Sequence, residues 1–310
     1  MRLGTGPRLL TRPGLRTHDT RVPVGQRHLS VSLVCLQDIL EQAARLEIGF
    51  YRMSAQLLPL LGTDDLPTFW QQLQESETLA CWIGGQANRR GTRLTVHPML
   101  DVQLGSEDDD LAQRSRTVAI AWSALMDCMD LGRESCIVVH VGGTARENSL
   151  EAFSRNLDRL PEPTRQRLAV ENDDRHFSLG DVLWLSAREG TPVVWDYLHW
   201  RCLNPEGIPA QEAAAAAAAT WPAGLRPKAH FSSPRTSPVR GRPPTPRQHA
   251  EYVDPFAFAD YLAWLGPTAP WDVMLEAGAK DLALLKLRAD LDSTHHRNAS
   301  PEERTAVATA

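Results

Sequence analysis

The chain has 310 residues, of which 42% are apolar and 23% are charged, and its formal net charge is −5. These values are typical of a soluble globular protein with a sizeable core, and a net negative charge argues against a generic nucleic-acid binder. No apolar run is long enough for a signal peptide or a membrane span, so we expect a cytoplasmic protein without a membrane partner. The five cysteines show no CxxC spacing and indicate neither a disulfide scaffold nor a zinc finger.

Short apolar segments alternate with amphipathic segments along the chain. Strands are predicted, in chain order, at residues 1–5, 48–54, 93–98, 136–143, 167–173, 192–199, 226–232 and 272–277. The spacing of apolar residues predicts helices at 33–47, 69–87, 110–129, 149–157, 179–188, 255–264 and 281–287. The alanine-rich stretch 211–219 is compatible with a helix or with a low-complexity patch.

Eight strands that alternate with helices are typical of an α/β protein, and eight such units fit a (β/α)₈ TIM barrel. A doubly wound open sheet is the alternative, but it usually carries a Gly-rich fingerprint after its first strand. The segment "GTGPRLL" lacks the G-x-G-x-x-G spacing of that fingerprint. We therefore predict a single barrel domain over residues 1–288. The polar, patternless residues 289–310 are predicted to form a disordered tail.

Side chains that commonly bind metals lie at the ends of six predicted strands, for example where the apolar run of "RLAVENDD" ends in acids. These residues are His97, His140, Glu171, Asp196, His199, His230 and Glu276. A strand-end histidine alone is more often a hydrogen-bonded core residue, but the carboxyl ends of barrel strands converge on one face, where active sites of this fold lie. Seven nitrogen and oxygen ligands exceed the need of one tetrahedral zinc and suit two or three Mn²⁺ or Zn²⁺ ions. Paired ions of this kind can hydrolyse phosphodiesters.

Lys228 lies two residues before His230 and is expected to face the barrel interior with it, because alternate residues of a strand share a side. Two roles remain open from the sequence. The lysine could neutralise Glu171 or Glu276, or it could be carbamylated and bridge two ions.

A basic loop is predicted at residues 234–247, "PRTSPVRGRPPTPR", which contains four arginines, five prolines and no acid. The prolines exclude a helix or a central strand. The loop follows the strand 226–232 on the predicted catalytic face, where it could track a phosphate backbone. A solvated variable loop is the alternative.

Several motifs resemble the UV-damage endonucleases in order and spacing. They are "TVHP", "VVHVGG", "AVENDDR", "DYLH", "RPKAHFS" and "VMLEAGAKD", and "YRMSAQLLP" is similar as well. The resemblance runs from about residue 28 to residue 285. It implies a TIM barrel related to endonuclease IV and to the xylose-isomerase-like barrels. It also implies a DNA repair enzyme that cuts 5′ to pyrimidine photodimers with divalent ions, commonly manganese.

The resemblance also implies roles for individual residues. The seven residues above become metal ligands, with Glu171 and Lys228 as catalytic residues and Asn172 and Asp173 orienting the ligands. A further set is implied to bind DNA, namely Arg235, Arg240, Arg242, Arg247, His249 and Lys280. We thus expect a monomeric enzyme that acts on damaged double-stranded DNA and has two or three Mn²⁺ ions as cofactors, with Zn²⁺ or Mg²⁺ as alternatives. Attack on the phosphate 5′ to a flipped-out lesion is the expected chemistry.

Five positions depart from the family pattern. Leu100 and Asp101 replace a glutamine and an aromatic residue that probe the DNA stack. Thr63 and Trp200 stand where histidines occur in relatives, and Gly278 stands where a basic residue is expected. The candidate metal ligands match the family pattern, whereas the sequence leaves open the range of lesions and the activity on photoproducts. Two other functions remain open, a sugar isomerase or epimerase of the same superfamily and a DNA-binding paralogue with altered catalysis.

Overall fold

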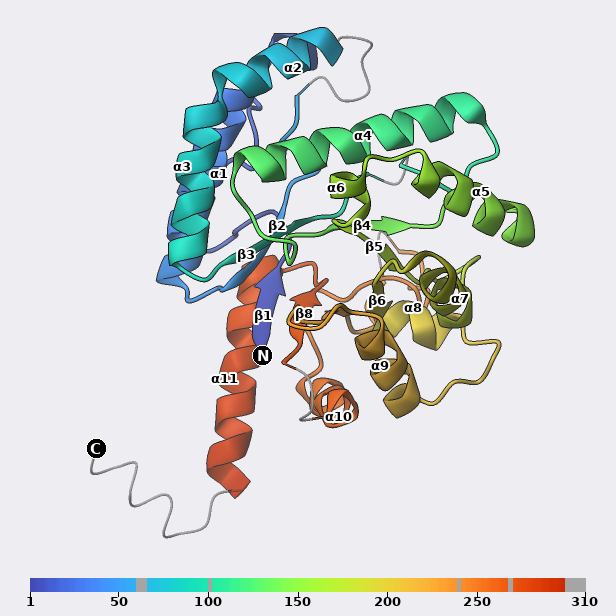
Figure 1. Cartoon of the computed structure of the whole chain (residues 1–310). Helices are drawn as coiled ribbons and strands as arrows, with labels where there is room; N and C mark the ends of the chain where they lie inside the picture. Colours follow the sequence, from blue (N-terminus) through green and yellow to red (C-terminus); the bar gives the residue numbers. More distant parts are fainter. Residues whose placement is uncertain (60–65, 100–101, 239–240, 267–269, 299–310) are drawn as a thin grey trace.

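The eight predicted strands form one closed parallel barrel with the helices outside it (Figure 1). This computed structural model describes residues 1–59, 66–99, 102–238, 241–266 and 270–298. The strands are β1 (Arg2–Thr5), β2 (Phe50–Met53), β3 (Arg93–Val96), β4 (Ile137–His140), β5 (Leu168–Glu171), β6 (Val193–Asp196), β7 (Lys228–Phe231) and β8 (Asp272–Leu275). They are ordered as in the sequence, and β8 closes the barrel by pairing with β1. The predicted (β/α)₈ barrel is confirmed.

Helices cover the barrel between consecutive strands (Figure 1). A short 3₁₀ turn, η1, spans Val24–Gln26. The α-helices are α1 (Leu29–Arg45), α2 (Leu66–Glu75), α3 (Glu77–Arg89), α4 (Asp109–Cys128), α5 (Arg146–Asp158), α6 (Glu162–Arg165), α7 (Leu179–Glu189), α8 (Tyr197–Cys202), α9 (Ala210–Ala219), α10 (Pro255–Leu265) and α11 (Lys280–Asn298). No helix among these described residues is long and apolar enough to cross a membrane.

In strand β7, apolar residues that face the outer helices alternate with polar residues that face the barrel interior. The ring of Phe231 stacks on Tyr197 at a centroid distance of 5.0 Å and packs against Phe258 of α10. Because alternate side chains of a strand point to opposite sides, Lys228 and His230 face the interior instead. Lys228 and His230 were predicted to face the same side of the strand. The aromatic cluster on the outer side of β7 explains why that side is the barrel interior.

A buried charge network fills the amino-terminal end of the barrel. Asp272 is fully buried, and its Oδ2 accepts from Arg2 Nη2 at 2.6 Å and from Arg93 Nη1 at 3.0 Å. Arg93 is 1% exposed, and its Nε also donates to the carbonyl of Glu134 at 2.6 Å. Buried charges persist where they are paired and hydrogen-bonded in this way. The network closes the end of the barrel opposite the predicted site.

The structure differs from the prediction at three elements. The strand predicted at 192–199 ends at Asp196, whose side chain accepts from the backbone N–H of His199 and caps α8. The helix predicted at 69–87 is two helices, which Ser76 separates. The short helix α6 was not predicted.

The helix α11 continues past the expected start of the tail. Leu284 and Leu287 are buried, and Leu291 packs against the core, so an apolar stripe supports the helix beyond residue 288. Residues up to Asn298 are helical, which corrects the expected disorder over 289–298. Residues 299–310 lie outside the described part of the chain.

Candidate metal centre

All seven side chains predicted as metal ligands come together at the carboxyl ends of the strands. They form three overlapping groups, in each of which one atom per residue lies within 4.8 Å of the others. The groups are His97, His140 and Glu171; Glu171, Asp196 and His199; and Asp196, His230 and Glu276. Glu171 and Asp196 each belong to two groups. A carboxylate has two oxygens and can bind two ions, so the sharing suits adjacent ions with bridging acids.

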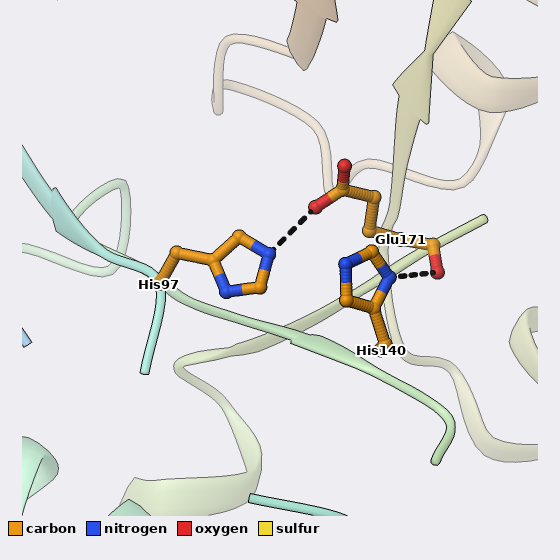
Figure 2. A group of neighbouring side chains, drawn as sticks. All are labelled: His97, His140 and Glu171. Atoms are coloured by element: carbon orange, nitrogen blue, oxygen red, sulfur yellow. Dashed lines mark hydrogen bonds and ion pairs between the residues drawn. The ribbon is translucent and has the colours of Figure 1, made fainter. Parts of the chain in front are cut away.

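Glu171 lies at the centre of the cluster and is 1% exposed. His97 Nε2 lies 3.0 Å from one carboxylate oxygen (Figure 2), and His230 Nδ1 lies 2.9 Å from the other. His140 faces the backbone of the same residue, with its Nδ1 3.4 Å from the Glu171 carbonyl oxygen. Histidines from the ends of three other strands thus surround Glu171, two of them at its carboxylate and one at its backbone carbonyl.

Asp196 and His199 are positioned by the turn from β6 into α8. Asp196 Oδ1 accepts from the His199 backbone N–H at 2.8 Å, which fixes this oxygen, whereas Oδ2 lies 3.9 Å from His230 Nδ1 and has no hydrogen-bond partner among the described residues. His199 Nδ1 lies 3.0 Å from the carbonyl oxygen of Asn172. Metal-binding histidines commonly use one ring nitrogen in this way and bind the ion through the other.

Glu276 follows β8 and has a cationic partner that the sequence analysis missed. Its Oε1 forms an ion pair with Arg52 Nη1 from β2 and lies 3.5 Å from His230 Nδ1. An arginine inside an otherwise apolar strand, "FYRM", was the available signal. It was overlooked because Arg52 does not stand at a strand end.

Four buried polar atoms of this cluster have no hydrogen-bond partner among the described residues. They are Asp196 Oδ2, His230 Nε2, Lys228 Nζ and Glu171 Oε2, the last of which lies in ion-pair contact 3.0 Å from His97 Nε2. Buried polar atoms are normally paired, so unpaired ones in a cluster of ligand type call for an ion or water. Four imidazoles and three carboxylates suit Mn²⁺ or Zn²⁺. The residues present therefore fit a metal centre.

The electrostatics of the cluster favour cations. Burial opposes the charge of Glu171, but the imidazoles of His230 and His140 outweigh it and hold the pKa of Glu171 well below its usual value. Burial raises the pKa of Asp196 and lowers the pKa of Lys228 to about 8. Despite burial, Asp196 and Glu171 raise the pKa of His199 to about 9. Nearby imidazoles therefore outweigh burial at Glu171, whereas burial prevails at Asp196.

The two residues expected to orient the ligands have different contacts. Asn172 is fully buried and bonds to the backbone of Asp196. The carboxylate of Asp173 instead accepts from the backbone N–H groups of Arg175, His176 and Phe177, at 2.7, 2.6 and 3.2 Å. Asp173 thus shapes the loop after β5 rather than contacting a ligand side chain through these bonds.

The two ends of the basic loop lie side by side on the face of the barrel that carries the candidate ligands. Its ends form an antiparallel bridge between Pro234 and His249, and the Arg235 N–H donates to the Gln248 carbonyl at 2.6 Å. Arg235 pairs with Glu251 at 3.1 Å, and Arg247 pairs with Asp174 at 3.3 Å.

The other residues predicted to bind DNA lie in different surroundings. Arg242 is exposed, and Arg240 lies outside the described residues. His249 stands beside the ligand groups, with Nδ1 3.7 Å from Glu276 Oε2 and its ring 6.2 Å from that of His199. Lys280 begins α11, next to Gly6.

Two of the five positions that depart from the family pattern, Trp200 and Gly278, lie among the described residues. Thr63, Leu100 and Asp101 lie outside the described residues. Trp200 packs near Tyr197, and its Nε1 donates to the Ile208 carbonyl at 3.2 Å, so its role here is packing. A Cβ at Gly278 would lie 2.2 Å from Glu251 Oε2, so Glu251 occupies the space that a larger residue would need.

The fold and the site define a (β/α)₈-barrel protein with a candidate centre for several metal ions. The chain belongs to the UV-endonuclease UvdE family, because the model of that family matches residues 28–304.

Two relatives support this assignment. A protein of Bacillus velezensis named UV DNA damage endonuclease is 30% identical, covering 79% of this chain and 76% of its own length. A protein of the same name from Halalkalibacterium halodurans is 31% identical, covering 83% and 79%.

Solved structures agree with the family assignment. The crystal structure of SacUVDE has a TM-score of 0.82 and 28% identity, covering 95% of this chain and 99% of its own. Endonuclease IV from Thermus thermophilus has a TM-score of 0.55 and 16% identity, covering 94% and 100%. D-psicose 3-epimerase from Clostridium cellulolyticum has a TM-score of 0.54 and 13% identity, covering 91% and 90%. The last two show a shared fold alone.

Proposed function

We propose that this protein is a metal-dependent DNA repair endonuclease that hydrolyses the phosphodiester 5′ to UV photoproducts or related lesions. The observation that carries the proposal is the convergence of seven ligand side chains into three overlapping groups, in a family whose relatives are named UV DNA damage endonuclease. Two or three divalent ions, with Mn²⁺ as the first candidate, fit these groups.

The bound ions would supply Lewis acidity and an activated water for phosphodiester hydrolysis. The protein residues supply and position the charged groups around the reacting phosphate. Glu171 and Asp196 carry the shared negative charge, and Asn172 fixes the backbone of Asp196. Lys228 contributes a buried amino group from the barrel interior, which has no hydrogen-bond partner among the described residues and lies 5.7 Å from the centre of the Phe50 ring. The burial of these groups excludes water from the reacting phosphate and strengthens each charge interaction.

Activity on defined duplexes tests the proposal. The protein is incubated with Mn²⁺ and a duplex that carries one cyclobutane dimer, beside an undamaged duplex and an abasic duplex. A nick 5′ to the dimer that disappears with a chelator is the expected result. No nick on any duplex would refute the proposal. A nick at the abasic site alone would redirect it to chemistry like that of endonuclease IV.

The basic loop is proposed to contact the DNA backbone. Arg242 is exposed, so Arg242→Gln should weaken binding and lower the slope of log Kd against log salt by about one. The matched control is Arg90→Gln, because the exposed Arg90 follows α3 at the amino-terminal end of the barrel. An unchanged slope for the Arg242 variant would exclude this contact.

A further inference from the structure

Arg52 has a cationic neighbour, Lys280, as well as its anionic partner, Glu276. Its Nη1 pairs with Glu276, while its Nη2 lies 3.4 Å from the point where a Cβ on Gly6 would stand. Lys280 Nζ lies 3.9 Å from the same point. Two cationic groups from β2 and α11 therefore flank one small space above a buried glycine, at the edge of the metal centre.

The backbone of Lys280 is strained for a lysine. Its φ is +51°, in the left-handed region, which is unfavourable for a residue other than glycine. Such outliers persist where the surrounding structure fixes them, and they gather at functional sites. The left-handed turn begins α11 and places the ammonium group beside Gly6.

The loop that carries Gly6 is held from both sides. The Tyr51 hydroxyl donates to the Pro7 carbonyl at 2.7 Å. Asp281, fully buried, accepts from the N–H groups of Leu10 and Thr11 at 2.6 and 3.0 Å. The space between the two cations is thus built into the fold before any ligand binds.

The charges at this space are incompletely balanced once metals bind. Glu276 is the carboxylate paired with Arg52, and it is also a candidate metal ligand. An ion on Glu276 would take up its negative charge and leave the Arg52 and Lys280 pair to attract another anion. Guanidinium and ammonium groups are the side chains that bind phosphate. Gly6 lets the phosphate approach closely, because it has no side chain.

We propose that Arg52 and Lys280 form a site for a phosphate of the cleaved DNA strand, next to the phosphate held at the metal ions. The proposal rests on the proposed endonuclease function and deepens it, since it assigns Arg52 a contact with the substrate.

Two variants test this site without touching a metal ligand. Lys280→Met removes one cation, and Gly6→Val fills the space while both cations remain. Arg90→Gln is the control with an equal charge change on the opposite face. Binding is measured with Mn²⁺ on a dimer-containing duplex in which a methylene group replaces the bridging 3′ oxygen of the cleaved linkage. That duplex keeps its charge and resists hydrolysis. The metal content of every variant is measured in parallel.

Both test variants should bind about 5- to 10-fold more weakly, with metal content unchanged, and Lys280→Met should lower the salt slope by about one. A neutral methylphosphonate at a phosphate neighbouring the cleaved one should weaken binding of the wild type by a similar factor. The same replacement should cost the two variants little, because their contact is already lost.

The outcomes separate this inference from the proposed function. If the wild type nicks the dimer but both variants bind and respond to the methylphosphonate as it does, the phosphate site is wrong and the endonuclease function stands. If the variants bind more weakly only because they have lost metal, the phosphate site is also wrong and the endonuclease function stands. If the wild type neither binds nor nicks the duplex, both proposals fail.

Discussion

Asn172 and Asp196 are joined by two hydrogen bonds between the ends of β5 and β6. Asn172 Nδ2 donates to the Asp196 carbonyl at 3.1 Å, and the Asp196 N–H donates to Asn172 Oδ1 at 2.9 Å. Both residues are fully buried. The pair fixes the strand end that carries a carboxylate shared by two ligand groups, so the amide acts on the metal centre through the backbone of its neighbour.

Replacement of Asn172 by alanine should weaken metal binding. It removes the two side-chain hydrogen bonds to the N–H and C=O groups of Asp196, which costs about 1–3 kcal/mol of folding free energy. Loss of a residue that orients ligands typically lowers metal affinity about 10- to 100-fold. Calorimetric titration with Mn²⁺ and thermal unfolding of the metal-free protein measure the two effects. The control is Asn148→Ala, because Asn148 is exposed and bonds only to Glu107 in the described contacts. Equal Mn²⁺ affinity in both variants would contradict the role of Asn172.

The sharing of Glu171 predicts that Glu171→Gln loses more metal than Glu276→Gln. Glu171 belongs to two ligand groups and Glu276 to one, and each substitution removes one negative charge while keeping the shape. Nicking by Glu171→Gln should fall by more than about 100-fold, a loss at the upper end of what misplaced ligands cause. Metal content by mass spectrometry after gel filtration tests the ranking. Full metal content and activity in Glu171→Gln would show that the centre lies elsewhere.

Lys228→Met should stabilise the metal-free protein, and the gain should depend on pH. Burial lowers the pKa of Lys228 from 10.5 to about 8. Between these values the unfolded chain binds the proton and the folded chain does not, so wild-type stability rises with pH across this window. The advantage of the variant is therefore greatest below pH 8 and shrinks by about 3 kcal/mol towards pH 10.5.

Urea unfolding in chelator at pH 7 to 10 measures this difference. Lys286→Met is the control, because Lys286 is exposed on α11 and pairs with Asp290. A pH-independent difference between Lys228→Met and the wild type would mean that the amino group is paired in solution.

The network at the amino-terminal end should contribute strongly to stability. Asp272→Asn removes the fully buried partner of Arg2 and Arg93, and breaking a buried pair in this way costs about 3–5 kcal/mol. Glu134→Gln removes another partner of Arg2, but its side chain is 42% exposed, so the cost should stay below about 1 kcal/mol. Equal midpoints for the two variants in urea would refute the ranking.

The grouping of the seven candidate ligands was predictable because a parallel barrel aligns all strand ends on one face. His140, Glu171 and Asp196 stand at the last positions of β4, β5 and β6, where an apolar run gives way to a polar ligand. His199 was assigned to a strand and lies in α8, yet it still reaches the centre, since Asp196 caps that helix. An error in local structure therefore did not displace the residue from the site.

Arg52 and the surroundings of His249 were not predictable from local patterns. Each depends on a partner far along the chain, namely Glu276. Likewise, the arginines of the basic loop were treated as equivalent, but Arg247 pairs with Asp174 of another loop. The spacing of residues along the sequence does not predict contacts between segments that are far apart in the chain.

The sequence by itself determined the barrel, the face on which the candidate ligands gather and the residue types of the seven candidates, because periodicity and strand ends are local properties that parallel topology aligns. Only the tertiary structure decided which candidate ligands form a common group, which cations among the described residues are paired, and how the left-handed Lys280 lies relative to Arg52. These relationships depend on distances between side chains from different strands, and those distances exist only after the barrel has closed.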